Sequence, residues 1–314
     1  MFDRIVQVTS LFFFGVAVYL IAKEVEKVGF LHLIHLIAST PWWLLGIAFV
    51  FTFLDYIALS FYDILALDYV GKKIPYKTVF KTSSIGFAVS NTAGHAYASG
   101  GTIRYLFYTP CGLSKIEIVE IIAFEALTFL MGMGIAYLVS MGLTVFDPVL
   151  HTYPHRMILD ISAWVTLIVF AAYYFFFVRR GRLFHISGTE IKTPDIKMTM
   201  KQLLVGFLDN FSVAVVFYAI LRYHIDAAFL DVFIVFIIAQ TIAITTQVPG
   251  GVGIFEGLFL YLFSHTPAEK IGILAALVVF RCLYFFTPFI LALIYLAYYR
   301  IRKSYKGMHD RLLS

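Results

Sequence analysis

Long apolar runs alternate with short polar segments along the whole chain. A helix needs about 20 apolar residues to cross a bilayer. Runs of this kind predict about six membrane spans, at residues 5–22, 41–67, 115–143, 157–178, 200–223 and 269–300. Residues 23–40 mix Leu and Ile with Lys, Glu and His, which is typical of an amphipathic helix in the membrane interface.

Two stretches break the pattern with small or polar residues. Residues 82–109 are rich in Ser, Thr, Asn and Gly and contain Gly100-Gly101. Residues 229–264 are apolar but contain a Pro- and Gly-rich interruption with Gly250-Gly251. Non-helical backbone at membrane depth is tolerated only inside protein or beside a cavity. Both stretches are therefore predicted to be broken or re-entrant helical hairpins.

The order of these segments predicts an all-α integral membrane protein with eight hydrophobic segments. About six are spans, and two are the hairpins of an inverted repeat. Repeat 1 is residues 41–145 with the hairpin at 82–109, and repeat 2 is residues 200–300 with the hairpin at 229–264. Inverted repeats are typical of transporters, whose sites lie near the bilayer midplane. The other predicted units are residues 1–40 (first span and interfacial helix), 146–199 (connecting helix and basic loop) and 301–314 (basic tail).

Composition and charge agree with a membrane protein. Hydrophobic residues are 61% of the 314 and charged residues only 14%, against roughly 25% charged in soluble domains. Lys and Arg gather in residues 71–81, 179–201 and the tail. Because such residues concentrate on the cytoplasmic side, both termini are predicted to be cytoplasmic in a multi-pass protein of the cell or inner membrane. Most Phe and Tyr residues are expected to face lipid or headgroups.

Ionisable residues within the predicted spans and hairpins are candidate site residues, because a charge at the bilayer centre costs about 3 kcal/mol or more. They are Asp55, Arg104, Glu125, Asp209, Glu256 and Arg281. A rise of about 1.5 Å per residue puts Glu125 and Arg281 near the bilayer middle, where they could meet. It puts Asp55 and Asp209 at similar depth. Asp55, Asp209, Glu125 and His95 are candidates for proton or ion coupling, with plain interhelical hydrogen bonding as the alternative.

The glycine pairs place charges near predicted helix starts. Glu256 follows Gly250-Gly251 in a first turn, where a carboxylate complements the helix dipole. Arg104 follows Gly100-Gly101 in the equivalent place, so a nearby anion or buried carboxylate is expected. Arg104, Glu256, Arg281 and both glycine pairs are therefore candidates for substrate binding, with a lipid phosphate as one occupant. The alternative is that Arg104–Glu256 and Arg281–Glu125 are structural ion pairs.

Several of these segments resemble a known family. Gly-Gly-Thr-Ile-Arg-Tyr at 100–105, Pro-Gly-Gly-Val-Gly-Ile-Phe-Glu at 249–256, Arg-Cys-Leu-Tyr-Phe at 281–285 and Pro288 are similar to the lysylphosphatidylglycerol synthase transmembrane-region family. These are the flippase-like domains of multiple peptide resistance factors and their stand-alone relatives. The resemblance implies movement of phospholipids, such as aminoacylated phosphatidylglycerol, between leaflets. It also implies that Arg104, Glu256 and Arg281 line the lipid pathway, whereas Glu125 matches none of the family's motifs.

Full-length members of that family carry further helices and an aminoacyl-transferase domain. This chain is therefore not expected to be the synthase by itself, and its lipid need not be the lysylated one. The sequence contains no nucleotide loop, metal-ligand spacing or catalytic triad pattern. No enzymatic activity, cofactor, metal or nucleic-acid partner is expected. The expected partners are membrane phospholipids, a separate lipid-modifying synthase and a second copy in a homodimer.

Three functions follow from these observations. The first is a phospholipid flippase or lipid transporter. The second is a secondary transporter of a small polar or amphipathic solute, coupled to ions through Asp55 and Asp209. The third is a non-transporting membrane partner of a lipid-modifying enzyme. A lateral opening toward the bilayer would favour the lipid carrier over the solute carrier.

Overall fold

The computed structural model describes residues 38–93, 96–144, 156–178, 183–186, 189–246 and 253–312. The predicted span at 5–22 and nearly all of the predicted interfacial helix at 23–40 lie outside the described residues. So do His95 and the pair Gly250-Gly251.

The first half of the bundle is a long helix, two short helices and a second long helix. These are α3 (Trp42–Tyr69), α4 (Tyr76–Ala93), α5 (Ala96–Tyr108), the short 3-10 turn η1 (Thr109–Cys111) and α6 (Lys115–Thr144). Glycines at positive φ follow two of the helical segments, Gly71 after α3 and Gly112 after η1, because the left-handed conformation there disfavours a side chain.

The second half repeats this order of long, short, short and long elements. They are α9 (Ile196–Leu221), α10 (Phe229–Thr246), α11 (Ile254–Phe263), α12 (Pro267–Phe280), the π-helical turn η4 (Arg281–Phe286) and α13 (Thr287–Leu312). The order is the one that an inverted repeat requires, and the symmetry itself stays a prediction.

Between the halves lie α8 (Arg156–Tyr173), the π-helical turn η2 (Tyr174–Val178) and a short antiparallel hairpin. The hairpin pairs β1 (Leu183–Ile186) with β2 (Thr189–Lys192). The sequence pattern did not predict these strands, because it indicated only a polar basic loop at 179–201.

Four helices of the described part are long and apolar enough to cross a membrane: Trp42–Tyr69, Lys115–Leu143, Ile196–Leu221 and the composite helix Pro267–Arg302. Shorter apolar helices cover Asp160–Phe176, Phe229–Ala243 and Ile254–Phe263. Apart from the β-hairpin, the described chain is helical. The prediction of an all-α integral membrane protein is therefore confirmed.

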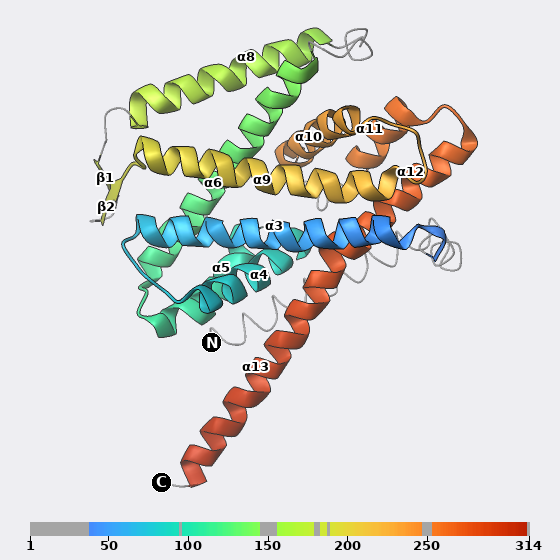
Figure 1. Ribbon diagram of the computed structural model, residues 1–314. Coiled ribbons are helices and arrows are strands. Elements are labelled where there is room, and N and C mark those ends of the chain that lie inside the picture. Colours follow the sequence, from blue (N-terminus) through green and yellow to red (C-terminus); the bar gives the residue numbers. More distant parts are fainter. Residues whose placement is uncertain are drawn as a thin grey trace.

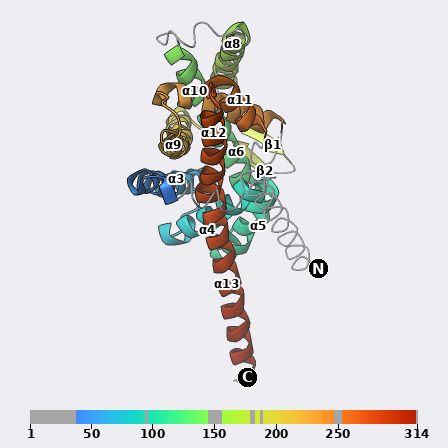
Figure 2. The ribbon, with the colours of Figure 1, turned by 90° about the vertical axis from the view of Figure 1, so that its right-hand side faces the viewer.

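The helices form a bundle centred on α3 and α9, which lie side by side (Figure 1). In the second half, the core gathers the buried apolar residues of α9, α10 and α12, with Phe217 among its fully buried rings. The helix α8 contacts α6 on the side of the bundle away from α4 and α5, and α13 extends outward to the C-terminus (Figure 2). The β-hairpin, the α3–α4 connection and the start of α6 lie at one end of the bundle (Figure 1).

The structure corrects the predicted position of the first hairpin break. Gly100 and Gly101 lie inside α5, which begins at Ala96, so they do not mark its start. Their small size instead allows neighbouring helices to approach closely. A Cβ on Gly100 would lie 2.4 Å from the Ser90 Oγ, and one on Gly101 would lie 2.7 Å from the Ile122 Cδ1. The glycines allow close packing of α5 against α4 and α6. The predicted break at this position was therefore wrong, because the two glycines serve helix packing and not a turn.

Candidate functional site

A buried ion cluster joins three helices of the first half. Arg104 of α5 donates from Nε to Asp63 Oδ1 of α3 at 3.0 Å and to Glu125 Oε1 of α6 at 2.7 Å. Its Nη2 donates to Asp63 Oδ2 at 2.8 Å. Tyr108, one turn further along α5, donates its hydroxyl to Asp63 Oδ1 at 2.7 Å. One guanidinium therefore faces two carboxyl groups, and all four side chains are buried.

Small residues make the space that the Arg104 side chain occupies. A Cβ added to Gly86 or to Gly100 would lie 3.0 Å from the Arg104 Nη1. The guanidinium also lies over the ring of Phe87, 4.8 Å from its centroid, at a distance that suits a cation–π contact. The site is thus built on α4 and α5 as a close fit around one charged side chain.

The predicted ion pairs are wrong in their partners. Arg104 pairs with Asp63 and Glu125, not with Glu256. Arg281 pairs with Glu256, not with Glu125, and Arg281 Nη1 lies 2.5 Å from Glu256 Oε1. Arg104 also lies in the third turn of α5, away from a helix start. Depth along the bilayer cannot distinguish partners at the same level, since the helix packing decides which of them touch.

The second polar group is the carboxyl pair of Asp55 on α3 and Asp209 on α9. Both are buried, and the two carboxyl groups face each other within hydrogen-bonding range. Tyr284 of η4 donates to Asp55 Oδ2 at 2.5 Å, and Tyr62 of α3 donates to Asp209 Oδ2 at 2.7 Å. The predicted similar depth of the two aspartates agrees with this contact, which joins the two halves of the chain.

The third group is the Arg281–Glu256 ion pair in the second half. Glu256 lies in the first turn of α11, as predicted, and its Oε2 accepts from the backbone N–H of Gly253 at 2.7 Å. Arg281 begins the π-helical turn η4, which also presents Tyr284 three residues later. Single π turns within α-helices occur often at functional sites. This turn places side chains into two of the three polar groups.

Four residues of these groups were not predicted from the sequence. Asp63 lies eight residues after Asp55 on α3, near the end of the predicted span. Its place on the buried stripe of the helix could have been recognised from that spacing. Tyr62, Tyr108 and Tyr284 are buried donors, contrary to the expectation that tyrosines mostly face lipid. No local signal separates such tyrosines from those at the membrane surface.

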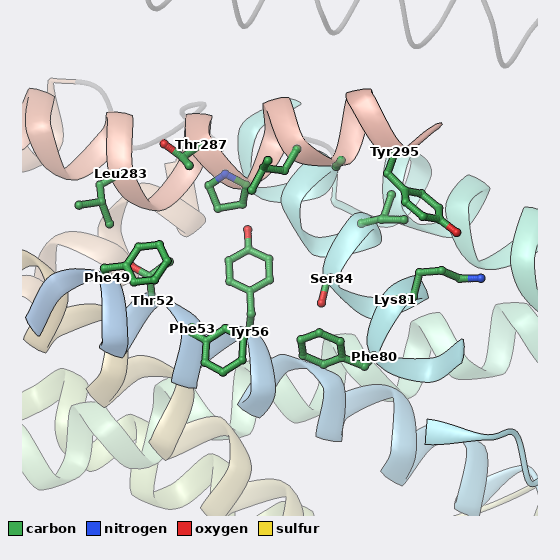
Figure 3. Close-up of a pocket in the computed structure, with 14 residues that line it drawn as sticks. Phe49, Thr52, Phe53, Tyr56, Phe80, Lys81, Ser84, Leu283, Thr287 and Tyr295 are labelled. Atoms are coloured by element: carbon green, nitrogen blue, oxygen red, sulfur yellow. The ribbon is translucent and has the colours of Figure 1, made fainter. Parts of the chain in front are cut away.

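A cavity of about 420 Å³ lies between α3, α4, η4 and α13 (Figure 3). Most of its walls are hydrophobic side chains, such as Phe49, Phe53 and Leu291. Lys81 and Tyr295 lie together at one end of it, and Phe49 and Leu283 lie at the other (Figure 3). Its volume falls within the range of about 300–1,000 Å³ typical of small-molecule sites.

Two polar side chains in the cavity wall have buried oxygen atoms without a hydrogen-bond partner: the Tyr56 hydroxyl and the Ser84 hydroxyl. The Lys81 Nζ lies 4.6 Å from the centroid of the Phe107 ring and 6.0 Å from that of Tyr295. The cavity is therefore an apolar slot with one cationic end and a few polar atoms along its length.

Known proteins are similar to most of this chain. The family described as lysylphosphatidylglycerol synthase TM region matches residues 7–292. The uncharacterized protein slr0712 of Synechocystis sp. is 30% identical over 249 residues, which are 77% of this chain and 74% of that protein. The inner membrane protein YbhN of Escherichia coli is 26% identical over 245 residues, 76% of this chain and 75% of YbhN.

The similarity extends to part of a longer enzyme. Phosphatidylglycerol lysyltransferase of Staphylococcus haemolyticus is 26% identical over 257 residues, which are 81% of this chain but only 29% of that protein. This chain therefore spans less than a third of the lysyltransferase. Together with the family match over residues 7–292, these similarities show that the chain belongs to the lysylphosphatidylglycerol synthase transmembrane-region family.

Proposed function

We propose that this protein moves anionic or aminoacylated phospholipid between the two leaflets of the membrane. The observation that carries the proposal is the apolar cavity with Lys81 at one end. An acyl chain matches the hydrophobic walls, and a lipid phosphate matches the ammonium group. The name of the relative phosphatidylglycerol lysyltransferase also indicates that it acts on a phospholipid, which supports the same class of substrate.

The cavity also favours a lipid over a small polar solute. Its walls are mostly aromatic and aliphatic side chains from α3 and α13. A polar solute would leave such walls and its own polar groups without matching contacts. The basic end of the cavity lies on the early part of α4, where Lys81 is the sixth residue. We propose that this end faces the cytoplasm, in keeping with the positive-inside rule.

Arg281 and Glu256 are proposed to meet the headgroup at another stage of its passage, beyond the cavity end opposite Lys81. Arg281 lies two residues before Leu283, which lines the cavity end opposite Lys81. Arg104 is proposed to act in a different way. Because two carboxyl groups already hold its guanidinium, it would fix α3, α5 and α6 against one another instead of binding phosphate directly. Gly100 and Gly101 serve the same packing.

The proposal is tested with purified protein in vesicles that contain fluorescent phosphatidylglycerol, whose transfer is followed by quenching of the outer leaflet. The test variant is Leu291→Trp, which fills the cavity from an exposed position on α13. The matched control is Ile290→Trp, since Ile290 is exposed beside it and does not line the cavity. We expect Leu291→Trp to slow transfer at least severalfold and Ile290→Trp to leave it unchanged. Equal rates for both variants would contradict the proposal.

A second pair of variants tests the headgroup contact. Lys81→Ala removes the cation at the cavity end, and Lys77→Ala removes an exposed cation one turn earlier on α4. We expect the Lys81 variant to lose transfer of anionic phosphatidylglycerol more than transfer of zwitterionic phosphatidylethanolamine. The same loss for both lipids would mean that Lys81 does not contact the headgroup charge.

A further inference from the structure

Asp55 and Asp209 form a buried carboxyl pair to which lipid binding assigns no role. Asp55 belongs to the first half of the chain and Asp209 to the second, and their carboxyl groups lie within hydrogen-bonding range of each other. Two ionised carboxylates at such a distance repel strongly in a buried site, because little solvent screens their charges. Such a pair normally retains a proton on one member.

The hydrogen bonds to the tyrosines leave the Oδ1 atom of Asp55 without a donor. Tyr284 and Tyr62 each occupy the Oδ2 atom of one aspartate. The Oδ1 atom of Asp55 is buried and has no hydrogen-bond donor. A buried acceptor is costly to leave without a donor. A proton on one of the facing carboxyl groups would supply the missing donor and remove one of the two charges.

No cation takes the place of that proton within the described part of the chain. The interactions of the two carboxyl groups are with each other and with their tyrosines. The other titratable groups nearby are Tyr56, on which Asp55 acts, and Glu125, which acts on Tyr62. Tyrosine carries no positive charge, and Glu125 is held by Arg104 in the neighbouring cluster.

We infer that Asp55 and Asp209 hold one exchangeable proton between them and that its release drives α3 and α9 apart. The ligand of this site is a single proton. On release, one carboxyl O–H bond breaks, the proton leaves for water, and two negative charges remain in contact between the halves of the bundle. The pair is thus a proton-sensitive contact between α3 and α9, which pack extensively side by side (Figure 1).

The carboxyl pair lies next to the cavity wall. Tyr56 follows Asp55 on α3 and lines the cavity, where its hydroxyl is buried without a hydrogen-bond partner (Figure 3). The Tyr56 ring lies 6.4 Å from the ring of Tyr284, which holds Asp55. A molecule in the cavity would therefore contact a side chain that packs against the proton site. Coupling of the proton to lipid movement rests on the proposed function, whereas the proton site itself does not.

The proton is tested first without transport, by infrared spectroscopy of the full-length protein in lipid nanodiscs. A protonated carboxyl group has a C=O stretch distinct from that of a carboxylate. We expect the protein at neutral pH to show a protonated carboxyl band that disappears in alkaline buffer. Asp55→Asn and Asp209→Asn should each remove this band, and Asp68→Asn, at an exposed position of α3, should leave it. Tyr284→Phe should shift the band without removing it, which gives a readout even if an Asn variant does not fold.

Coupling is tested in vesicles with an imposed pH difference across the membrane. If one proton moves with each lipid, a pH difference of one unit across the membrane can sustain up to about a tenfold difference in lipid between the leaflets. We expect the unaltered protein to approach this asymmetry and Asp55→Asn to transfer lipid without building it. The Asp68→Asn control should behave like the unaltered protein.

The outcomes separate this inference from the proposed function. Absence of the band at neutral pH, or its persistence in both Asn variants, overturns the proton site. A shift of the band by added NaCl but not by the same concentration of choline chloride would assign the site to a metal cation and also overturn it. The expected band without any lipid transfer would support the proton site and contradict the flippase proposal. Lipid transfer without the band would support the flippase proposal and contradict the proton site.

Discussion

Arg104 of α5 carries a charge that is costly in a membrane, and carboxyl groups from two other helices hold it. Its partners Asp63 and Glu125 come from α3 and α6, and the three side chains are buried. The alternatives for Arg104, a packing role or direct substrate contact, predict different consequences for folding. Removal of one member of a buried ion pair typically costs about 3–5 kcal/mol, because its partner remains as an uncompensated charge.

Arg104→Met is therefore expected to lower the free energy of unfolding by about 3–5 kcal/mol. The measurement is denaturant or thermal unfolding in detergent micelles. Arg222→Met is the control, because Arg222 is exposed beyond the end of α9, and it should change stability by less than about 0.5 kcal/mol. Combining Arg104→Met with Asp63→Asn and Glu125→Gln should restore part of the loss. A stable Arg104→Met variant that fails to transfer lipid would instead support direct headgroup contact.

His224 gives the fold a pH dependence outside the spanning helices. It lies between α9 and α10, and burial lowers its pKa from the ordinary value. Its Nε2 has no hydrogen-bond partner, and its Cβ packs close to Gly272 of α12. Because the unfolded chain binds a proton more readily, stability should fall as pH drops below about 6.5. Above that pH, His224 should not affect the stability of the protein.

The expected result is a midpoint of thermal unfolding that decreases less between pH 7 and pH 5 in His224→Asn than in the unaltered protein. His265→Asn serves as the control, since His265 is exposed before α12. The interpretation would be refuted by parallel pH curves for the unaltered protein and His224→Asn.

At the scale of elements, α6 and α9 cross at a pair of glycines. A Cβ on Gly132 would lie 2.3 Å from the Gly206 Cα, and one on Gly206 would lie 2.5 Å from the Gly132 Cα. The backbones therefore touch directly, as small residues allow in membrane helices. Gln202 of α9 also donates to Thr128 of α6 at 2.9 Å beside this crossing.

Gly132→Ala should destabilise the protein by about 1–3 kcal/mol, because the added methyl group forces the helices apart. Gly142→Ala, on the same helix, has nothing within 4 Å of the added Cβ, and there alanine should stabilise by up to about 1 kcal/mol through its helix propensity. Opposite signs for the two variants in unfolding measurements would support the crossing, and equal effects would contradict it.

At the scale of the whole molecule, the native cysteines report orientation. Cys111 is exposed in the turn between α5 and α6, at the end of the bundle that carries the basic loops. Cys282 lies half-buried in η4 within the composite helix. If the basic end is cytoplasmic, a membrane-impermeant maleimide should label intact cells poorly and permeabilised cells strongly. Cys111→Ser should abolish that label, whereas strong labelling of intact cells would reverse the orientation.

The spans and the polar candidates could be predicted from the sequence to different degrees. The spans at 41–67 and 115–143 were confirmed within a few residues as α3 and α6, because length and apolarity determine a crossing. Glu256 was correctly placed in a first turn, because glycine before an acidic residue is a local signal. Gly100-Gly101 was wrongly assigned to a break, because small residues serve turns and close packing alike.

The sequence by itself determined the membrane class, the long helices and most of the charged residues inside the bundle, since each depends on local apolarity and on the cost of a charge in lipid. Only the tertiary structure decided which charges touch. It assigned Arg104 to Asp63 and Glu125, Arg281 to Glu256, and Asp55 to Asp209. Partners in a bundle lie on different helices at the same depth, and the crossing of those helices selects among them.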